Sequence, residues 1–314
     1  MSSDATAKPP ASTPIDGLPP ELRRWAVAAI FTALAMASLD TAIANIALPA
    51  IAADLRVSPA EVVWVVNVYQ IALVATLLPL GALGEIVGHR RVYLGGLLLF
   101  TLASLGCALA WSLPSLTAAR ALQGLGASGI MSVNAALVRF VYPTHMLGRG
   151  FGHNALVVGT AFTLGPTIAS GILSVGTWPW LFAINIPFGA VAIWIGLKTL
   201  PQTPRAAHAF DFPSAALTAS CLGLFGIGIG SAAHQASPIL VGLELAGAML
   251  LGWLMTRRHA DHPAPMLPID LFKCSRCPPR PRSVRSRCRD WRSFHCPSTS
   301  KTCCGGRKWR PASS

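Results

Sequence analysis

The chain has 314 residues, of which 53% are hydrophobic and only 12% are charged. Soluble domains carry about 25% charged residues, so this composition argues against a soluble enzyme, a disordered chain and a secreted disulfide scaffold. The net charge of +13 is uneven, because residues 273–314 hold 12 Lys and Arg with a single acid, Asp290. The sequence therefore predicts an apolar membrane body followed by a basic tail of different character.

Residues 1–24 are polar and proline-rich, which predicts a flexible cytosolic lead. No short apolar core with a small-residue cleavage site follows, so we expect the first apolar segment to be an uncleaved anchor. A helix needs about 20 mostly apolar residues to cross a bilayer. Eight segments meet this requirement, at about 25–48, 61–83, 92–111, 115–140, 150–175, 180–197, 214–232 and 238–256. The residues thus predict an all-α polytopic membrane protein.

The basic residues predict the orientation of these segments, because loops rich in Lys and Arg stay on the cytosolic side. With the N-terminus in the cytosol, only Arg56 lies in an outer loop, and Arg120 lies within a segment. The basic residues on the cytosolic side are then Lys8, Arg23, Arg24, Arg90, Arg91, Arg139, Arg149, Lys198, Arg205, Arg257 and Arg258. We therefore expect an integral protein of the cell (inner) membrane with a cytosolic N-terminus.

Asp40 and Arg120 lie within apolar segments, where a charge costs about 2.5–3.5 kcal/mol on insertion scales. Asp40 is midway along the first segment. It is either a proton carrier or a polar residue that a neighbouring helix satisfies. Arg120 begins the fourth segment, and Gln123 shares its helix face. It either neutralises a carboxylate or extends to the outer interface. Arginine does not release its proton at ordinary pH, so only the acid is a candidate carrier.

Other polar residues in the segments have two interpretations. Asn67 and Gln70 in the second segment and Asn134 in the fourth could line a cavity or join helices by hydrogen bonds. Glu244, in the eighth segment, is a lone acid with no evident partner. The body shows neither the residue spacing of a metal site nor a phosphate-binding G-x-x-x-x-G-K-[ST] loop. We therefore predict no metal and no cofactor.

The loop between the second and third segments reads GALGEIVGHRR, residues 81–91. It resembles the cytosolic loop signature G-x-L-a-D-r-x-G-r-[KR]-[KR] of the major facilitator superfamily. Glu85 stands where the family has Asp, and His89 stands where it usually has Arg, so the charge cluster here is weaker. The resemblance implies a cytosolic gate formed by Gly81, Glu85, Gly88, Arg90 and Arg91.

Four further segments are similar, in order, to motifs of the drug:proton antiporters in that superfamily. LDTAIANIALP (39–49) resembles their first-helix signature, and LTAARALQGLG (116–126) resembles the fourth-helix proton-coupling motif. AFTLGPTIASG (161–171) resembles the fifth-helix antiporter motif, with Ala-Ser in place of its usual Gly-Gly. WPWLFAINIPFG (178–189) is similar to the sixth-helix signature of the group with fourteen helices.

The resemblance covers about residues 25–272 and implies a domain order. Residues 25–197 would be the first six-helix half of a major facilitator transporter. A cytosolic loop (198–213), two linker transmembrane helices (214–256) and a cytosolic linker (257–272) would follow. The implied function is not enzymatic but proton-coupled export of drugs or other small amphipathic molecules. The partners would be the substrate, protons and the lipid bilayer, with no nucleic acid.

The resemblance also assigns roles to single residues. The proton-coupling pair would be Asp40 and Arg120. The substrate cavity would be lined by Asn45, Asn67, Gln70, Gln123 and Asn134. The antiporter motif would consist of Gly165, Pro166 and Gly171.

A complete member of the family would continue with six more helices after about Phe272. Residues 273–314 instead hold six cysteines among Arg, Ser and Pro. Three interpretations compete: a zinc site begun by Cys274 and Cys277, a segment that binds anionic lipid or nucleic acid, and a tail produced by a reading-frame change. The abrupt change in composition favours the third, with a disordered tail. Drug export has two alternatives. The first is a non-transporting membrane fragment or partner subunit, and the second is a nutrient uptake carrier.

Overall fold

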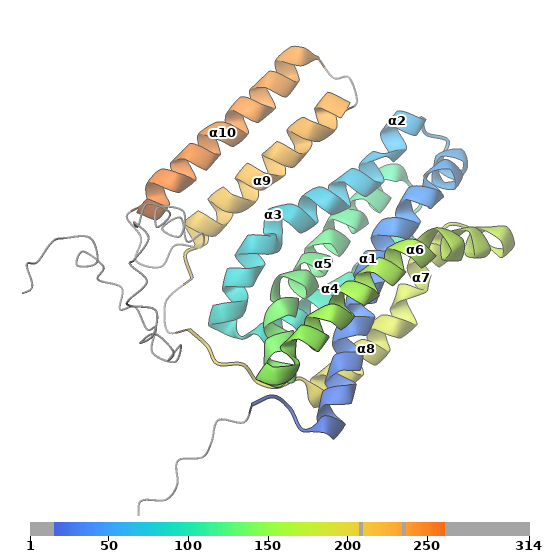
Figure 1. Ribbon diagram of the computed structural model, residues 1–314. Coiled ribbons are helices and arrows are strands. Elements are labelled where there is room, and N and C mark those ends of the chain that lie inside the picture. Colours follow the sequence, from blue (N-terminus) through green and yellow to red (C-terminus); the bar gives the residue numbers. More distant parts are fainter. Residues whose placement is uncertain (1–15, 207–209, 234–236, 261–314) are drawn as a thin grey trace, which may run out of the picture. The chain divides into compact units, whose positions relative to one another are not determined.

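The computed structural model describes residues 16–206, 210–233 and 237–260, and the basic tail lies outside these ranges. Every regular element within them is helical (Figure 1). The elements are α1 (Pro20–Leu55), α2 (Pro59–Val62), α3 (Trp64–Val87), α4 (His89–Ala108), α5 (Leu113–Val141), η1 (Thr144–Met146), α6 (Leu147–Val175), α7 (Pro179–Ala183), α8 (Asn185–Thr199), α9 (Phe212–Ala233) and α10 (Pro238–Ala260). Eight spans in these ranges are long and apolar enough to cross a membrane. The predicted all-α polytopic fold is confirmed.

Local sequence signals set the ends of these helices. Ser58 and Ser112 begin α2 and α5 with capping boxes, in which each serine binds a backbone amide of the first turn. α1 begins at Pro20, inside the lead expected over residues 1–24, because proline is favoured in the first turn of a helix. Gly88 separates α3 from α4 with φ 106°, a conformation that glycine adopts without a steric penalty.

Glycines let α5 approach two neighbouring helices at backbone distance. A Cβ atom on Gly124 would lie 2.4 Å from the Tyr69 carbonyl oxygen of α3. A Cβ atom on Gly126 would lie 2.4 Å from the Phe100 nitrogen of α4. In lipid the hydrophobic effect does not drive helices together, and small residues instead allow the close backbone packing that holds them. The glycine-rich part of α5 is therefore a surface of close helix contact.

The last two spans form a pair that attaches to α3 through α9. A Cβ atom on Gly226 of α9 would lie 3.0 Å from Ile71 Cγ1 of α3. Between the two helices of the pair, Cys221 Sγ of α9 lies 3.3 Å from the Ala248 carbonyl oxygen of α10. These contacts place α9 beside the second span and α10 beside α9.

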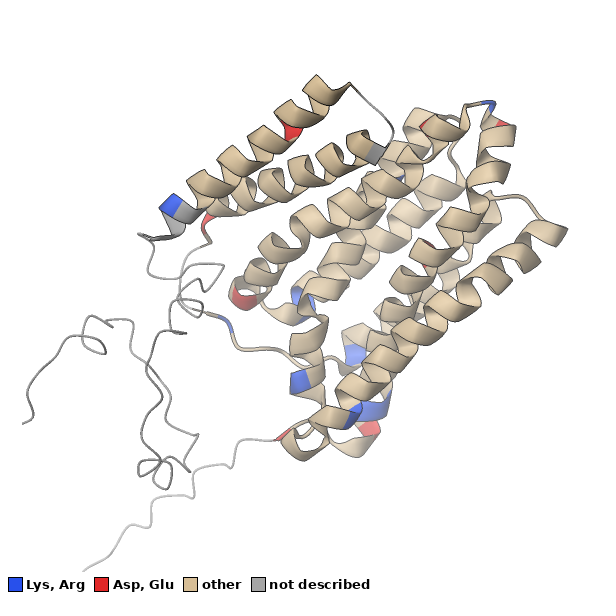
Figure 2. Cartoon of the chain, turned by 45° about the horizontal axis from the view of Figure 1, so that its top comes forward, with Lys and Arg blue, Asp and Glu red and all other residues tan. Residues whose placement is uncertain are grey.

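Lys and Arg gather at one end of the helices (Figure 2). We call this the basic end; it contains the start of α1, the α3–α4 turn, the α5–α6 connection and the segment after α8. Arg56 ends α1 at the opposite end. Basic residues are thus concentrated at one end of the helices, which is the asymmetry used to predict the orientation in the membrane. That the basic end faces the cytosol stays a prediction.

Candidate functional site

The centre of the candidate site is an ion pair between Asp40 of α1 and Arg120 of α5. Both residues are buried, with 3% of Asp40 and none of Arg120 exposed. Arg120 Nη1 donates to Asp40 Oδ2, and Arg120 Nε donates to the Val65 carbonyl oxygen at 3.2 Å. Arg120 therefore does not extend to the interface. It neutralises a carboxylate in the protein interior.

Gln123 connects this pair to α4. Its Nε2 donates to Asp40 Oδ1 and to Ser104 Oγ, both at 2.9 Å, and its Oε1 accepts from Arg120 Nη1 at 2.7 Å. Asn185 of α8 donates to the same Asp40 oxygen at 3.4 Å. Cys107 Sγ lies 3.4 Å from Gln123 Oε1. We call this group the Asp40 cluster: Asp40, Ser104, Cys107, Arg120, Gln123 and Asn185.

Two aromatic rings complete the surroundings of Arg120. Its guanidinium carbon lies 4.2 Å from the centroid of the Tyr69 ring and 5.5 Å from that of Phe182. A desolvated cation gains about 2 kcal/mol from such a contact. Arg120 Nη2 has no hydrogen-bond partner in the described part of the chain. The guanidinium is thus held by one carboxylate, two neutral oxygens and two ring faces.

The Asp40 cluster joins two groups of helices. α1 makes its most extensive contacts with α6 and α8, whereas α5 makes its most extensive contacts with α3 and α4. The Asp40–Arg120 ion pair crosses from the first group to the second. A change in the charge of this pair therefore acts directly on the attachment of α1 to α5.

α6 approaches α1 next to this cluster. A Cβ atom on Gly165 would lie 2.5 Å from the Ala42 Cβ, two residues after Asp40. Pro166 follows inside the helix and removes one backbone donor. Gly171 has no atom within 4 Å of an added Cβ among the described residues. Of the three residues in the fifth-helix motif, Gly165 is therefore the one that sets the approach of α6 to α1.

Of the five polar residues expected in a substrate cavity, Gln123 lies in the Asp40 cluster. Asn134 of α5 is buried outside the cluster and donates to Asn154 Oδ1 of α6 at 2.7 Å. It joins α5 to α6.

The other three lie outside the cluster. Asn45 is exposed and donates to the Thr41 carbonyl oxygen of its own helix at 3.0 Å. Asn67 faces α9, with its Nδ2 3.7 Å from the position of a Cβ atom on Gly230. Gln70 is half-buried on α3. The cavity role of these residues stays a prediction.

The loop motif of residues 81–91 lies at the basic end and packs against the segment after α8. The Ala206 amide donates to the Glu85 carbonyl oxygen at 2.8 Å, and the His89 amide donates to Thr203 Oγ1 at 2.9 Å. Arg90 donates to the Leu197 carbonyl oxygen.

The charges of this motif are not paired with one another. Among the described residues, no ion pair joins Glu85 to Arg90 or Arg91, and the Glu85 side chain is exposed. Gly81 lies against α5, with an added Cβ 3.9 Å from Ser132 Cβ. The motif is therefore ordered mainly by backbone hydrogen bonds.

Residue patterns alone did not assign four polar or aromatic side chains to this site. Asn185 lies in the sixth-helix signature, which was the one signal that could have pointed to it. Ser104, Cys107 and Tyr69 occur in apolar segments, where small or aromatic residues carry no distinctive signal. Their place in the site follows only from helix rotation and packing.

Comparison with known proteins places this geometry in a family. The family described as Major Facilitator Superfamily matches residues 30–267. The chain belongs to the Major Facilitator Superfamily. It is 45% identical over 260 residues to the uncharacterized transporter YebQ of Escherichia coli (strain K12), covering 82% of this chain and 57% of that protein.

Two further relatives are named for what they carry. The riboflavin transporter RibZ of Clostridioides difficile (strain 630) is 32% identical, covering 80% of this chain and 55% of RibZ. The tetracenomycin C resistance and export protein of Streptomyces glaucescens is 30% identical, covering 87% of this chain and 52% of that protein.

The fold is also that of solved structures in this superfamily. The crystal structure of the human organic anion transporter MFSD10 (TETRAN) aligns with a TM-score of 0.52 at 19% identity, covering 66% of this chain and 55% of that one. The chain spans about half the length of the curated relatives it matches. It is an integral membrane protein of a transporter family.

Proposed function

We propose that this chain supplies the proton-coupling half of a transporter that exports drugs or similar small amphipathic molecules in exchange for protons. The observation that carries the proposal is the buried Asp40–Arg120 ion pair between α1 and α5. Ionisable side chains inside a membrane protein are costly, and they often mark proton or ion pathways.

The geometry of the Asp40 cluster supports a task for Asp40, Arg120, Gln123 and Asn185. Asp40 takes up the proton, because Arg120 stays charged at any ordinary pH. Gln123 and Asn185 donate to one oxygen of Asp40, while Arg120 donates to the other. Protonation of the carboxylate removes the counter-charge of Arg120 and leaves the guanidinium to the Val65 carbonyl, Gln123 and the ring faces.

The consequence of protonation is a weaker attachment of α1 to α5. A buried charge that loses its partner costs about 3–5 kcal/mol. Such a difference is large enough to shift a two-state equilibrium between helix arrangements by more than 100-fold. Proton uptake at Asp40 would thereby be linked to movement of the α1–α6–α8 group against α3–α4–α5. Gly165 would permit α6 to follow α1, because the two helices touch at this residue.

Transport itself requires a second helical half, since alternating access works by rocking one repeat against another around a central site. The matched relatives are nearly twice as long as their aligned regions. We therefore expect the chain to transport only together with such a half.

One relative is named for tetracenomycin C resistance and export, which supports the drug-export candidate. The name of the RibZ relative favours a second candidate, carriage of a flavin-like nutrient. The two candidates share the proton site and differ in the substrate.

A transport assay tests the proposal and separates the two candidates. The full chain is co-expressed with the C-terminal half of YebQ, and a proton gradient is imposed on inverted membrane vesicles. Gradient-dependent accumulation of tetracenomycin C in these vesicles supports drug export, and accumulation of riboflavin in right-side-out vesicles alone supports the nutrient carrier. The full chain without the added half is expected to accumulate neither compound.

The variant Asp40→Asn isolates the proton step. It should abolish gradient-driven accumulation, whereas Glu21→Gln should leave it unchanged, because Glu21 is an exposed acid in the first turn of the same helix. Equal accumulation by the Asp40→Asn and unsubstituted chains would remove Asp40 from the mechanism.

A further inference from the structure

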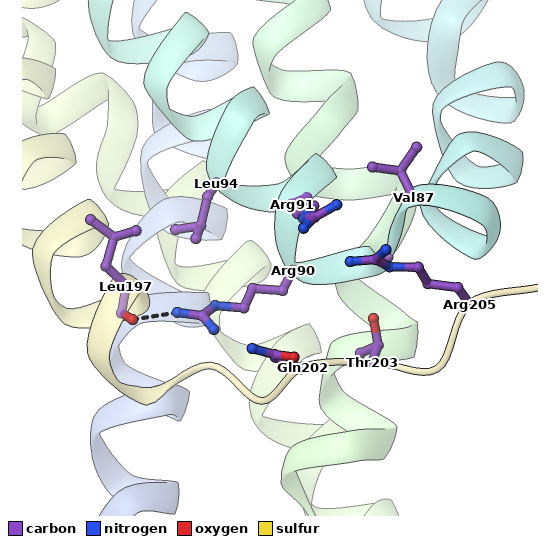
Figure 3. Close-up of a pocket in the computed structure, with 9 residues that line it drawn as sticks. Val87, Arg90, Arg91, Leu94, Leu197, Gln202, Thr203 and Arg205 are labelled. Atoms are coloured by element: carbon purple, nitrogen blue, oxygen red, sulfur yellow. Dashed lines mark hydrogen bonds between the residues drawn. The ribbon is translucent and has the colours of Figure 1, made fainter.

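A basic pocket of about 430 Å³ lies where the α3–α4 turn meets the segment after α8 (Figure 3). Three arginines line it: Arg90, Arg91 and Arg205. The other lining residues are Val87, Gly88, Leu94, Leu197, Gln202 and Thr203. Its described wall therefore contains three positive charges and no acid.

Backbone contacts bring the arginines together from distant parts of the sequence. The His89 amide donates to Thr203 Oγ1 at 2.9 Å, and the Ala206 amide donates to the Glu85 carbonyl oxygen at 2.8 Å. These two bonds fix the segment on both sides of Arg205 to the α3–α4 turn. A Cβ atom on Gly88 would lie 3.9 Å from Arg205 Nε, so glycine leaves this side of the pocket open.

The guanidinium groups keep most of their donors available. Arg90 gives one donor to the Leu197 carbonyl oxygen, as the dashed line in Figure 3 marks. In the described ranges, neither the Arg91 nor the Arg205 side chain has a hydrogen bond or an ion pair. α4 also begins here, and its N-terminus adds partial positive charge.

Like charges gathered without a counter-ion repel one another, and an anion in the pocket removes that cost. The planar guanidinium presents paired donors that match the oxygens of a phosphate. A pocket of this volume accommodates a phosphate with its attached glycerol, since ligand sites have volumes of about 300–1,000 Å³.

Apolar side chains in the same wall indicate where the phosphate comes from. Leu94 lies in the second turn of α4, and Leu197 lies in the last turn of α8 with 54% of its surface exposed. Both helices belong to candidate membrane spans and the pocket lies at their ends, so we expect it near the level where lipid headgroups meet acyl chains. Basic pockets between transmembrane helices are known to bind anionic headgroups.

We infer that this pocket binds the phosphate of an anionic phospholipid, held by Arg91, Arg205 and the free donors of Arg90. The site is separate from the Asp40 cluster and does not depend on transport. A bound lipid would join the α3–α4 turn to the segment after α8 through one shared anion.

Native mass spectrometry of the full chain in detergent tests the inference. Each phospholipid, phosphatidylglycerol or phosphatidylcholine, is added at increasing concentration, and the number of molecules that stay bound to the chain is compared between the two. The test variant is Arg91→Gln/Arg205→Gln, which leaves the Arg90–Leu197 bond in place. The control variant is Arg139→Gln/Arg149→Gln, which removes two exposed charges from the same end outside the pocket. Circular dichroism of each variant confirms that it is folded, and the single variant Arg205→Gln, altered only in a loop, repeats the test.

Phosphatidylglycerol should bind in preference to phosphatidylcholine, and the test variant should bind it roughly 30-fold more weakly, at about 1 kcal/mol for each basic side chain. The control should change binding by less than about threefold. Equal losses in the two double variants would overturn the site in favour of diffuse attraction. Displacement by inorganic phosphate or glycerol 3-phosphate at concentrations similar to the lipid would overturn the lipid as its ligand.

Discussion

The Asp40–Arg120 pair gives the sharpest stability prediction. Asp40→Ala should lower the free energy of unfolding by about 3–5 kcal/mol, because it leaves Arg120 buried without a counter-charge. The structure supports the upper part of this range. Three side chains donate to the lost carboxylate, and water does not replace them at a residue that is 3% exposed. Asp54→Ala is the matched control, since Asp54 is an exposed acid of the same helix with one bond, from Trp178 Nε1 at 2.7 Å. It should cost about 1 kcal/mol.

Denaturant unfolding of the purified chain in detergent, followed by circular dichroism, measures these values. The double variant Asp40→Ala/Arg120→Ala should be at least about 2 kcal/mol more stable than the sum of its single variants predicts, because the two charges are removed together. Additive losses, or a loss in Asp40→Ala no greater than in Asp54→Ala, would refute the reasoning that a buried charge pair holds α1 to α5.

Two further predictions concern helix packing and the start of α1. Gly165→Val should destabilise the chain by about 1–3 kcal/mol, because an added Cβ lies 2.5 Å from the Ala42 Cβ. Gly171→Val on the same helix should have little effect, since no described atom lies within 4 Å of its added Cβ. Similar thermal midpoints for the two variants would contradict this. The Thr144 hydroxyl and amide bind Asp16 and hold the pKa of its carboxyl below the usual value. This stabilisation is complete above about pH 4 and is lost as the pH falls through the lowered pKa. On acidification the thermal midpoint of Asp16→Asn should therefore fall less than that of the unsubstituted chain. An identical fall in the two proteins would count against the contact.

The sequence allowed the fold to be predicted well because membrane spans follow from one physical requirement. A helix must satisfy its backbone and present about 20 apolar residues to lipid. Asp40 and Arg120 were recognisable for the same reason, since a charge in such a segment is costly unless it has a partner. The motif resemblance then indicated that the two belong together.

The rest of the site depends on contacts that no local pattern encodes. Asn67 and Gln123 are both amides within apolar segments, yet one faces α9 and the other binds Asp40. The difference arises from the rotation of each helix and from where α9 packs. Ser104 and Asn185 are likewise small polar side chains of a kind common in membrane helices, and only the packed structure shows that they meet at one carboxylate.

The central claim, that Asp40 takes up a proton inside the helix bundle, is tested most directly by infrared difference spectroscopy. The full chain is reconstituted in liposomes, and spectra are recorded at an acidic and an alkaline pH. We predict a band from a protonated carboxylic acid that disappears in Asp40→Asn and persists in Glu21→Gln. A band of unchanged intensity in Asp40→Asn would contradict the account.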